Sequence, residues 1–201
     1  MLYLASSSPR RAELLRQIGV EFTILKVDID ELPLENEPAC QLVCRLSREK
    51  AREARRQLKS MQPGDLILAA DTVINLNGMV MGKPETHAHC CSMLETLSGR
   101  QHQVLSAITL INWRGEIKQS CTQNEITFKK LAFAEIDEYC RSGEPMDKAG
   151  AYAIQGRAAM FIRRLEGSYS SVMGLPLFET AQLLQQEGYD LNLTNKTHHE
   201  N

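Results

Sequence analysis

The stretch Asp65-Leu66-Ile67-Leu68-Ala69-Ala70-Asp71-Thr72-Val73-Ile74 decides the fold of this chain. An apolar run of strand length ends on a carboxylate, and the apolar pattern resumes after a threonine. Pro63-Gly64 precedes the run and Asn77-Gly78 follows it, which predicts a strand that leads into a hairpin. An acid inside an apolar strand must be paired, neutralised or bound to a cation, because burying a bare charge is costly. The simpler interpretation is an aspartate that ends the strand and caps a loop.

Length and composition indicate an ordinary globular protein. The chain has 201 residues, of which 43% are hydrophobic and 24% charged. We expect one domain of two lobes over residues 1–190 and a polar, disordered tail over residues 191–201. The net charge of −2 provides no basic field for nucleic acid. The sequence shows neither a membrane span nor a signal peptide, which predicts a cytoplasmic protein without a membrane partner.

Six cysteines raise the question of a metal site. Cys40 and Cys44 are four residues apart, which on a helix places them on one face, but the chain has no C-x-x-C pair. A structural zinc site requires a second close pair of ligands, and the irregular group from His87 to Cys91 is the nearest candidate. Free thiols in a reducing compartment are therefore the favoured interpretation.

The amino terminus reads as a short buried strand at Leu2–Ala5, a serine-rich turn that includes Ser7, and a helix from Pro9. Arg10 and Arg11 fall in the first helical turn, where the helix dipole favours anions over cations. Turn amides, serine hydroxyls and two guanidiniums together form a cradle for phosphate. The alternative is two solvated arginines at an exposed helix end.

A long helix is predicted from Ala39 to Lys59, after an acidic loop that contains Glu31. Lys50 is four residues from Leu46 and four from Ala54, so it lies on the apolar stripe of this helix. A lysine there either extends its charge to solvent along the helix surface or projects into a cleft toward a phosphate.

The remaining pattern alternates helices with strands and predicts an α/β protein. Strands are expected at 21–27, 103–111, 117–128 and 161–165, and helices at 84–97, at 134–141 and after Pro176 up to Gly188. Asp147-Lys148-Ala149-Gly150-Ala151 combines an acid, a base and small residues, a composition that favours close approach of the backbone to another group.

Six segments together resemble the Maf family of nucleoside triphosphate pyrophosphatases. They occur in the family's order and at its spacing, and they extend from residue 5 to about residue 177. The segments are Ala5-Ser6-Ser7-Ser8-Pro9-Arg10-Arg11, Arg48-Glu49-Lys50-Ala51, Ala70-Asp71-Thr72-Val73, Gly82-Lys83-Pro84, Asp147-Lys148-Ala149-Gly150-Ala151-Tyr152 and Gly167-Ser168-Tyr169.

The resemblance implies a fold, a reaction and a set of partners. The fold is an elongated mixed twisted sheet with flanking helices and a cleft between two lobes, similar to inosine triphosphate pyrophosphatases. The reaction is hydrolysis between the α- and β-phosphates to a monophosphate and pyrophosphate. Gly150-Ala151-Tyr152-Ala153-Ile154-Gln155-Gly156 matches the subfamily that acts on dTTP and UTP, a nucleotide-pool housecleaning role that extends to modified pyrimidine nucleotides. Family members commonly form homodimers, and the family is linked to septum formation.

The resemblance also assigns roles to residues. It implies Asp71 as the general base, and Arg10, Thr72 and Gln155 as residues that distinguish the subgroups. Since a triphosphate carries about four negative charges, cations must bind it. Carboxylates would repel it, so Glu31 and Asp71 imply a divalent metal, Mg²⁺ or Mn²⁺. The full set of predicted substrate-binding residues is Ser7, Arg10, Arg11, Lys50, Thr72, Lys83, Asp147, Lys148 and Gln155.

Three alternatives stay open from the sequence. The sister subfamily of the same family hydrolyses 7-methyl-GTP. A nucleotide- or nucleic-acid-binding regulator of septum formation would use the basic residues between Arg45 and Arg56, but Glu49 and Glu53 interrupt that run. A nucleotide kinase or transferase is disfavoured, because the chain has no G-x-x-x-x-G-K-[ST] loop.

Overall fold

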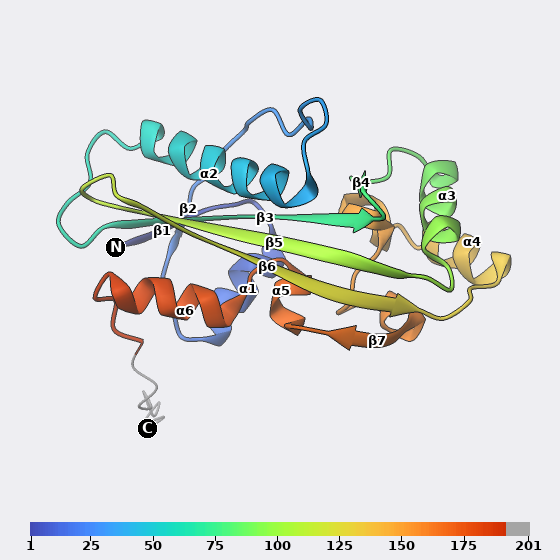
Figure 1. The fold of residues 1–201 in the computed structure, drawn as a ribbon. Helices are drawn as coiled ribbons and strands as arrows, with labels where there is room; N and C mark the ends of the chain where they lie inside the picture. Colours follow the sequence, from blue (N-terminus) through green and yellow to red (C-terminus); the bar gives the residue numbers. More distant parts are fainter. Residues whose placement is uncertain (192–201) are drawn as a thin grey trace, which may run out of the picture.

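The structure, a computed structural model, describes residues 1–191, and Figure 1 shows the order of its helices and strands. The strands are β1 (Leu2–Ala5), β2 (Thr23–Ile24), β3 (Leu66–Leu76), β4 (Met79–Met81), β5 (Gln101–Asn112), β6 (Ile117–Phe128) and β7 (Ile162–Glu166). The helices are α1 (Pro9–Gln17), α2 (Ala39–Gln57), α3 (His87–Leu97), α4 (Phe133–Arg141), α5 (Tyr169–Met173) and α6 (Leu177–Gln186). Three short 3₁₀ helices, Glu144–Asp147, Ala149–Ala151 and Arg157–Phe161, precede β7.

A mixed seven-stranded sheet forms the centre of the molecule. Its strand order is β2-β1-β3-β5-β6-β7, and β4 pairs separately with β3. The pairs of β1 with β2 and with β3 are parallel, whereas β3, β5, β6 and β7 pair in antiparallel order. The three long strands β3, β5 and β6 run the length of the elongated molecule in Figure 1, so that both of its ends share one sheet.

One edge of β3 has a gap in its strand pairing. Ala5, the last residue of β1, pairs with Ala69, and β4 begins to pair with β3 only at Ile74. Within residues 1–191, the segment Ala70–Val73 therefore has a strand partner only on its β5 side. Asp71 lies in this gap, in the middle of an 11-residue strand. The expectation that the strand ends at Asp71 is wrong, because the apolar residues on both sides continue one ladder along β5.

Helices cover both faces of the sheet at the end that contains β1. The helix α2 packs on one face, where Val43, Leu46 and Ala54 are buried against β3 and β5. On the opposite face lie α1 and α6, whose buried leucines share a cluster with Leu4 and Leu68. Buried residues recur every three to four positions along α2, and this pattern places Lys50 on the buried side of the helix, as its spacing predicts.

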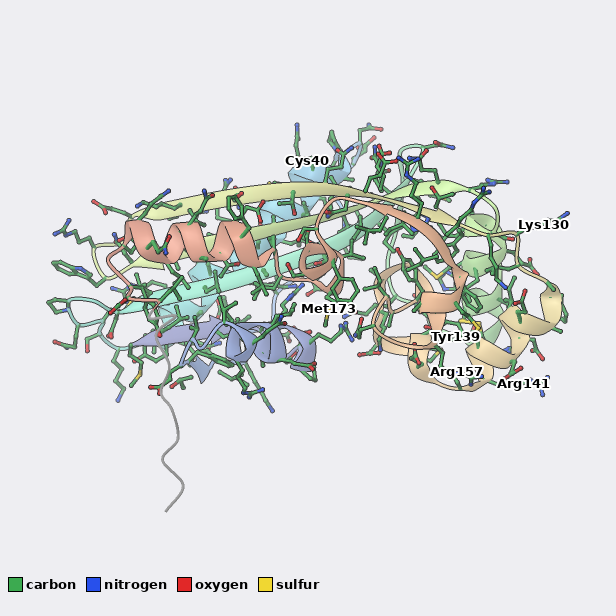
Figure 2. The ribbon with its side chains drawn as sticks, turned by 90° about the horizontal axis from the view of Figure 1, so that it is seen from below. Cys40, Lys130, Tyr139, Arg141, Arg157 and Met173 are labelled. Carbon is green, nitrogen blue, oxygen red and sulfur yellow. A yellow bond between two sulfur atoms is a disulfide. The ribbon has the colours of Figure 1, made fainter. Side chains whose placement is uncertain are left out.

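The other end of the molecule contains α3, α4 and the 3₁₀ helices, packed on the ends of β3, β5 and β6. Figure 2 shows Tyr139, Arg141 and Arg157 together at this end, and Met173 toward the middle of the molecule. Cys90 of α3 and Cys140 of α4 form a disulfide with a Cα–Cα distance of 6.1 Å. The prediction of six free thiols is therefore wrong for this pair, because their 50-residue separation in sequence does not reveal that the two helices pack together.

The α/β class with a mixed sheet and flanking helices is confirmed, and apart from β3 the element boundaries differ by three residues in two places. The strand expected at 21–27 pairs over only Thr23–Ile24. The helix expected from Pro84 begins at His87, because the Thr86 side chain accepts the bond from the His89 amide and so caps the helix. None of the helices in residues 1–191 is long and apolar enough to cross a bilayer. The tail predicted over 191–201 lies, apart from Leu191, outside the described residues.

Candidate active site

A cleft of about 900 Å³ lies between the two ends of the molecule. This volume is within the range of small-molecule sites. The β1–α1 turn, α2, the middle of β3 and the segment 147–155 all contribute to its walls. All eleven side chains predicted for the site line this one cleft: Ser7, Arg10, Arg11, Glu31, Lys50, Asp71, Thr72, Lys83, Asp147, Lys148 and Gln155.

Lys50 joins the two acids that were predicted to bind metal. Its Nζ lies 2.6 Å from Oδ1 of Asp71 and 2.6 Å from Oε1 of Glu31. The side chains of Lys50 and Asp71 are 11% and 8% exposed, whereas that of Glu31 is 49% exposed. Asp71 is therefore neither bare nor a loop cap: it is a buried carboxylate paired with a buried ammonium, and the pair opens to solvent on the Glu31 side.

The environment of Glu31 favours its charged form. Burial raises the pKa of this carboxyl, but the hydrogen bond from Lys50 and the charges of Lys50, Lys83 and Arg11 lower it by more. The pKa of Glu31 is therefore below its ordinary value. Glu31 is on the loop between β2 and α2, and the positive groups come from α1, α2 and the segment after β4. The cleft thus brings cations from three elements to one loop carboxylate.

Arg11 is fixed by contacts to three separate segments. Its Nε donates to the Gly174 carbonyl at 2.8 Å, Nη1 donates to Ser6 Oγ at 3.2 Å, and Nη2 donates to Thr72 Oγ1 at 3.5 Å. Burial lowers the pKa of its guanidinium, and the charge of Asp71 opposes that shift. Three of its five N–H donors are used in this way, so two are left for an anion in the cleft.

A buried serine fixes the orientation of Thr72. Ser106 Oγ donates to the Ser171 carbonyl at 2.7 Å, so its single proton is committed, and Thr72 must donate in their mutual bond of 2.9 Å. The lone pairs of the Thr72 hydroxyl then face Arg11. The sequence interpretation missed Ser106 and Ser171, because each occupies an ordinary strand or helix position and is connected to the cleft only by the fold.

The turn before α1 departs from its expected geometry. Ser8 occupies the N-cap position, but its side chain makes no capping bond, and Ser6 Oγ instead accepts from the Ser8 amide at 3.2 Å. Ser7 is exposed between them and lines the cleft. Residues Ser6 to Arg11 all line the cleft, and the anion cradle that was expected here stays a prediction.

The segment 147–155 forms the opposite wall. Arg10 Nη1 lies 3.4 Å from Asp147 Oδ2, and this ion pair joins α1 to that wall. Lys148 Nζ pairs with Asp147 and donates to the Glu144 carbonyl. Burial raises the pKa of Asp147, but its bond with Lys148 and the charges of Lys148 and Arg10 outweigh that effect and lower it. Gln155 is exposed at this wall.

Close backbone approach was expected at Gly150, and the structure identifies its neighbour. Gly150 has φ of +67°, and an added Cβ would lie 2.3 Å from Ile74 Cδ1. The Gly150 amide donates to the Gly82 carbonyl at 2.9 Å. The glycine therefore lets the 147–155 wall pack on β3 and on the Gly82-Lys83-Pro84 segment, which holds Lys83 at the cleft.

Formal charges in the cleft cancel. Among the described residues that line it, five are basic and five are acidic: Arg10, Arg11, Lys50, Lys83 and Lys148, with Asp30, Glu31, Asp71, Glu85 and Asp147. Mixed charge of this kind attracts an anion less strongly than a basic pocket does. A strongly anionic ligand in this cleft would therefore bind together with a counter-cation.

Sequence comparison identifies the relatives of this chain. The family model of Maf-like proteins matches residues 1–187. A dTTP/UTP pyrophosphatase of Aromatoleum aromaticum is 48% identical over 201 residues, covering 94% of this chain and 97% of the relative. A dTTP/UTP pyrophosphatase of Colwellia psychrerythraea is 46% identical over 189 residues, covering 94% of this chain and 89% of the relative.

Comparison with solved structures supports the fold. The Ham1 protein of Staphylococcus aureus matches with a TM-score of 0.51 at 14% identity, covering 92% of this chain and 98% of that protein. This likeness concerns the architecture of the sheet and its helices and not the chemistry of the cleft.

Proposed function

This chain belongs to the Maf-like protein family, and from that premise we propose that its cleft hydrolyses dTTP and UTP to the monophosphate and pyrophosphate. The relatives named dTTP/UTP pyrophosphatase, at 46–48% identity over most of the chain, support this activity. The observation that carries the proposal is the convergence of Asp71, Glu31 and Lys50 in a cleft that all the predicted site residues line. Removal of these nucleotides and of modified pyrimidine nucleotides from the pool is the role that follows.

In the proposed mechanism, the cations of the cleft hold the phosphate chain and Asp71 acts on water. Arg11, with two donors left, and Lys83, Lys148 and Lys50 neutralise the phosphates, since phosphoryl transfer is catalysed mainly by positioning and charge. Asp71 orients a water and accepts its proton during attack on phosphorus. The bond between the α- and β-phosphates breaks, and pyrophosphate leaves.

The carboxylates of Glu31 and Asp71 fit a divalent cation. Both already converge on one cation, the Lys50 ammonium, at 2.6 Å each. Carboxylate oxygens are the donors that Mg²⁺ and Mn²⁺ prefer, and an ion here would also balance the charge that a triphosphate brings to this neutral cleft. When bound, such an ion supplies charge neutralisation of the phosphate oxygens.

Chelation tests the metal. We expect EDTA to abolish pyrophosphate release and excess Mg²⁺ or Mn²⁺ to restore it, because the two acids otherwise repel the substrate. Calcium at the same concentration is the comparison ion, because it differs from Mg²⁺ and Mn²⁺ in size and in preferred coordination. Full activity after thorough chelation would exclude the metal while leaving the pyrophosphatase proposal intact.

The substrate class is tested with purified protein and a panel of triphosphates. The panel contains UTP, dTTP, CTP, GTP and 7-methyl-GTP, and the measurement is kcat/KM from pyrophosphate release. We expect UTP and dTTP to exceed CTP, and all three to exceed both guanine nucleotides. A lead for 7-methyl-GTP would assign the chain to the sister activity, whereas turnover of none would favour the non-enzymatic regulator.

Three further expectations remain predictions of the resemblance. These are the homodimer, the cytoplasmic location and the link to septum formation. Light scattering during size-exclusion chromatography measures the first of them. The activity proposed above depends on none of the three, because every residue assigned to it lies in one chain.

A further inference from the structure

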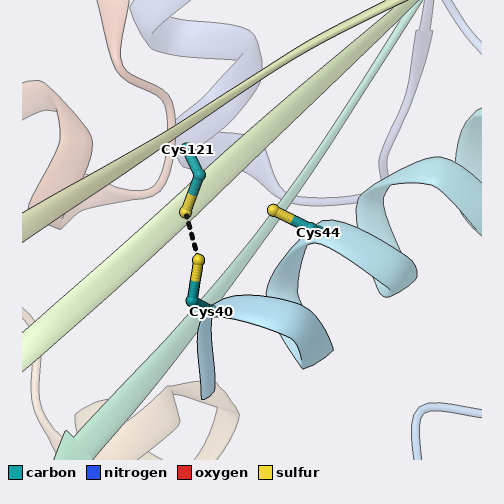
Figure 3. A group of neighbouring side chains, drawn as sticks. All are labelled: Cys40, Cys44 and Cys121. Carbon is teal, nitrogen blue, oxygen red and sulfur yellow. Dashed lines mark hydrogen bonds between the residues drawn. The ribbon is translucent and has the colours of Figure 1, made fainter. Parts of the chain in front are cut away.

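Three cysteines from two elements converge away from the cleft. Cys40 and Cys44 lie one turn apart on α2, and Cys121 lies on β6. Figure 3 shows their side chains directed toward one another. The three Sγ atoms all lie within 4.8 Å of one another, and Sγ of Cys40 and Sγ of Cys121 are 3.8 Å apart. Sequence spacing predicted the shared face of the first two and could not reveal the third.

The backbone around these sulfurs is held in place. Gln119, two residues before Cys121 on β6, donates from Nε2 to the Cys44 carbonyl at 2.7 Å. The same amide lies 3.1 Å from Ser47 Oγ and 2.8 Å from Thr109 Oγ1. This connection fixes α2 against β6 next to the cysteines, so the sulfurs are preorganised by neighbouring hydrogen bonds, as ligands in metal sites are.

The separations suit a thiolate-bound ion. A tetrahedral ion with bonds to sulfur of about 2.3 Å holds two of its sulfurs about 3.8 Å apart. The Cys40–Cys121 distance equals this value. The other pairs of sulfurs are no more than 4.8 Å apart, so movements of about 1 Å, which a change of side-chain rotamer provides, would complete the site. Cys40 is exposed and the other two are partly buried, so the ion could enter from solvent and keep one position for water.

The electrostatic setting also suits a metal–thiolate group. Cys40 lies in the first turn of α2, where the helix dipole favours negative charge. Burial raises the pKa of Cys44 and that of Cys121, and the Arg48 charge opposes part of that shift at Cys44. Without an ion the partly buried thiols are therefore neutral and do not repel one another; binding releases their protons to solvent.

We propose that Cys40, Cys44 and Cys121 form a three-thiolate site for a soft metal ion, of which Zn²⁺ is the probe. The site is separate from the carboxylates of the cleft, which prefer hard ions. Thiolates select Zn²⁺ and Cu⁺ over Mg²⁺ and Mn²⁺, so the two sites would take different ions from a mixture. The metal would tie α2, the helix that carries Lys50, to β6.

Differential alkylation of the full chain tests the site. The reduced, chelator-treated protein is labelled with iodoacetamide, with and without one equivalent of Zn²⁺, and each cysteine is quantified by mass spectrometry. We expect Zn²⁺ to slow labelling of Cys40, Cys44 and Cys121 at least tenfold, and EDTA to restore it. In Cys121→Ser, the same Zn²⁺ should no longer protect Cys40 or Cys44. Cys91→Ser, which alters a free cysteine outside the cluster, should keep full protection.

Three results would overturn the proposal. The first is labelling of Cys40 and Cys44 that Zn²⁺ does not change. The second is protection that persists in Cys121→Ser. The third is a loss of labelling that dithiothreitol reverses and EDTA does not, which would identify a Cys40–Cys121 redox pair. Since serine is close to cysteine in size, the circular dichroism spectrum of Cys121→Ser should match that of the wild type and confirm its fold.

Discussion

At the scale of single residues, the surroundings of Asp71 suit the role proposed for it. Its carboxylate is buried in the gap of β3 where strand pairing is interrupted, and its charge is balanced by Lys50 at 2.6 Å. A buried pair of this kind contributes little net stability, because desolvation of the two charges offsets much of their attraction. A structural role alone therefore explains the pair poorly, and its position in the cleft favours a functional one.

Substitution of Asp71 by Asn tests this role. Asn keeps the shape and an oxygen acceptor for Lys50 but cannot accept a proton from water. We expect kcat to fall by about 10²- to 10⁴-fold. Asp65→Asn is the control, since Asp65 is also a buried β3-proximal acid but pairs with the chain's amino group, outside the cleft. Wild-type turnover in a folded Asp71→Asn protein would remove the general-base assignment.

Gln155 is the residue whose exchange should change substrate preference. A glutamine amide offers one donor and one acceptor, which match O4 and N3–H of uracil and thymine. Glu at this position loses the donor, so kcat/KM for UTP should fall at least tenfold while that for 7-methyl-GTP does not. Gln185→Glu introduces the same charge at an exposed position on α6 and should leave the ratio unchanged. Equal losses on both substrates would indicate a general effect on binding.

At the scale of elements, the cleft depends on how the 147–155 wall is seated on β3. The left-handed backbone of Gly150 and its contact with Ile74 make this seating specific. Ala151, the next residue, also has a positive φ, of 59°. Glycine adopts this conformation without cost, but at Ala151 it is a local strain that the surrounding packing maintains.

Gly150→Ala should destabilise the protein through a clash as well as through backbone strain. We expect the free energy of unfolding to fall by roughly 1–3 kcal/mol from overpacking, in addition to about 1 kcal/mol from the positive φ. Gly78→Ala is the matched control, because Gly78 has φ of +90° but open space around it. In an Ile74→Val background, which lacks Cδ1, the clash part should become much smaller, because the shortest remaining contact is 3.3 Å. Urea denaturation compares the wild type, Gly150→Ala, Gly78→Ala, Ile74→Val and the double variant Ile74→Val/Gly150→Ala, and equal losses at positions 78 and 150 would contradict the clash.

Local signals predicted most elements, and long-range contacts explain the misses. Pro9 and Asn77-Gly78 correctly marked the start of α1 and the β3–β4 hairpin, because both act through neighbouring residues. The end of β3 was misplaced at Asp71 because a local reading treats a charge as a boundary. The partner that stabilises this charge, Lys50, is distant in sequence.

For the site, residue types were predictable and their connections were not. The eleven predicted residues share one cleft, as the family motifs implied. The supporting bonds of Ser106 and Ser171, the disulfide of Cys90 and Cys140, and the approach of Cys121 to α2 arise only from packing of distant segments. Nothing in the local sequence around these positions distinguishes them from ordinary core residues.

At the scale of the molecule, three long strands connect the end that contains β1 and α1 to the end that carries the 147–155 wall. The Arg10–Asp147 ion pair crosses between them, and Met173 packs against the apolar clusters of both ends. Since the strands are continuous, the stability of the distant end supports the geometry of the cleft. The buried cluster of His102, Phe128 and Tyr152 at that end therefore contributes to the stability of the whole protein.

That cluster contains a buried histidine that should make the protein sensitive to acid. His102 is 2% exposed, packs against Phe128, and its Nε2 lies 2.9 Å from the Tyr152 hydroxyl, while its Nδ1 has no hydrogen-bond partner among the described residues. Burial lowers the pKa of His102 from its ordinary 6.5 to about 4. Between these values the unfolded chain binds a proton that the native protein does not, so stability is complete above the unfolded pKa and falls as the pH decreases toward 4.

We therefore expect this histidine to lower the free energy of unfolding by about 2 kcal/mol between pH 7 and pH 5. His102→Gln removes the titration but keeps a partner for Tyr152, so its own loss over this interval should be smaller than that of the wild type by about the same amount. Exposed His89 provides the control, because His89→Gln should retain the wild-type acid sensitivity. Urea denaturation at the two pH values measures all three proteins, and carboxylates that titrate over this range contribute equally to each. An identical loss in His102→Gln and wild type would show that the histidine is protonated in the folded core without penalty, and the acid sensitivity would then belong to the paired carboxylates of the cleft.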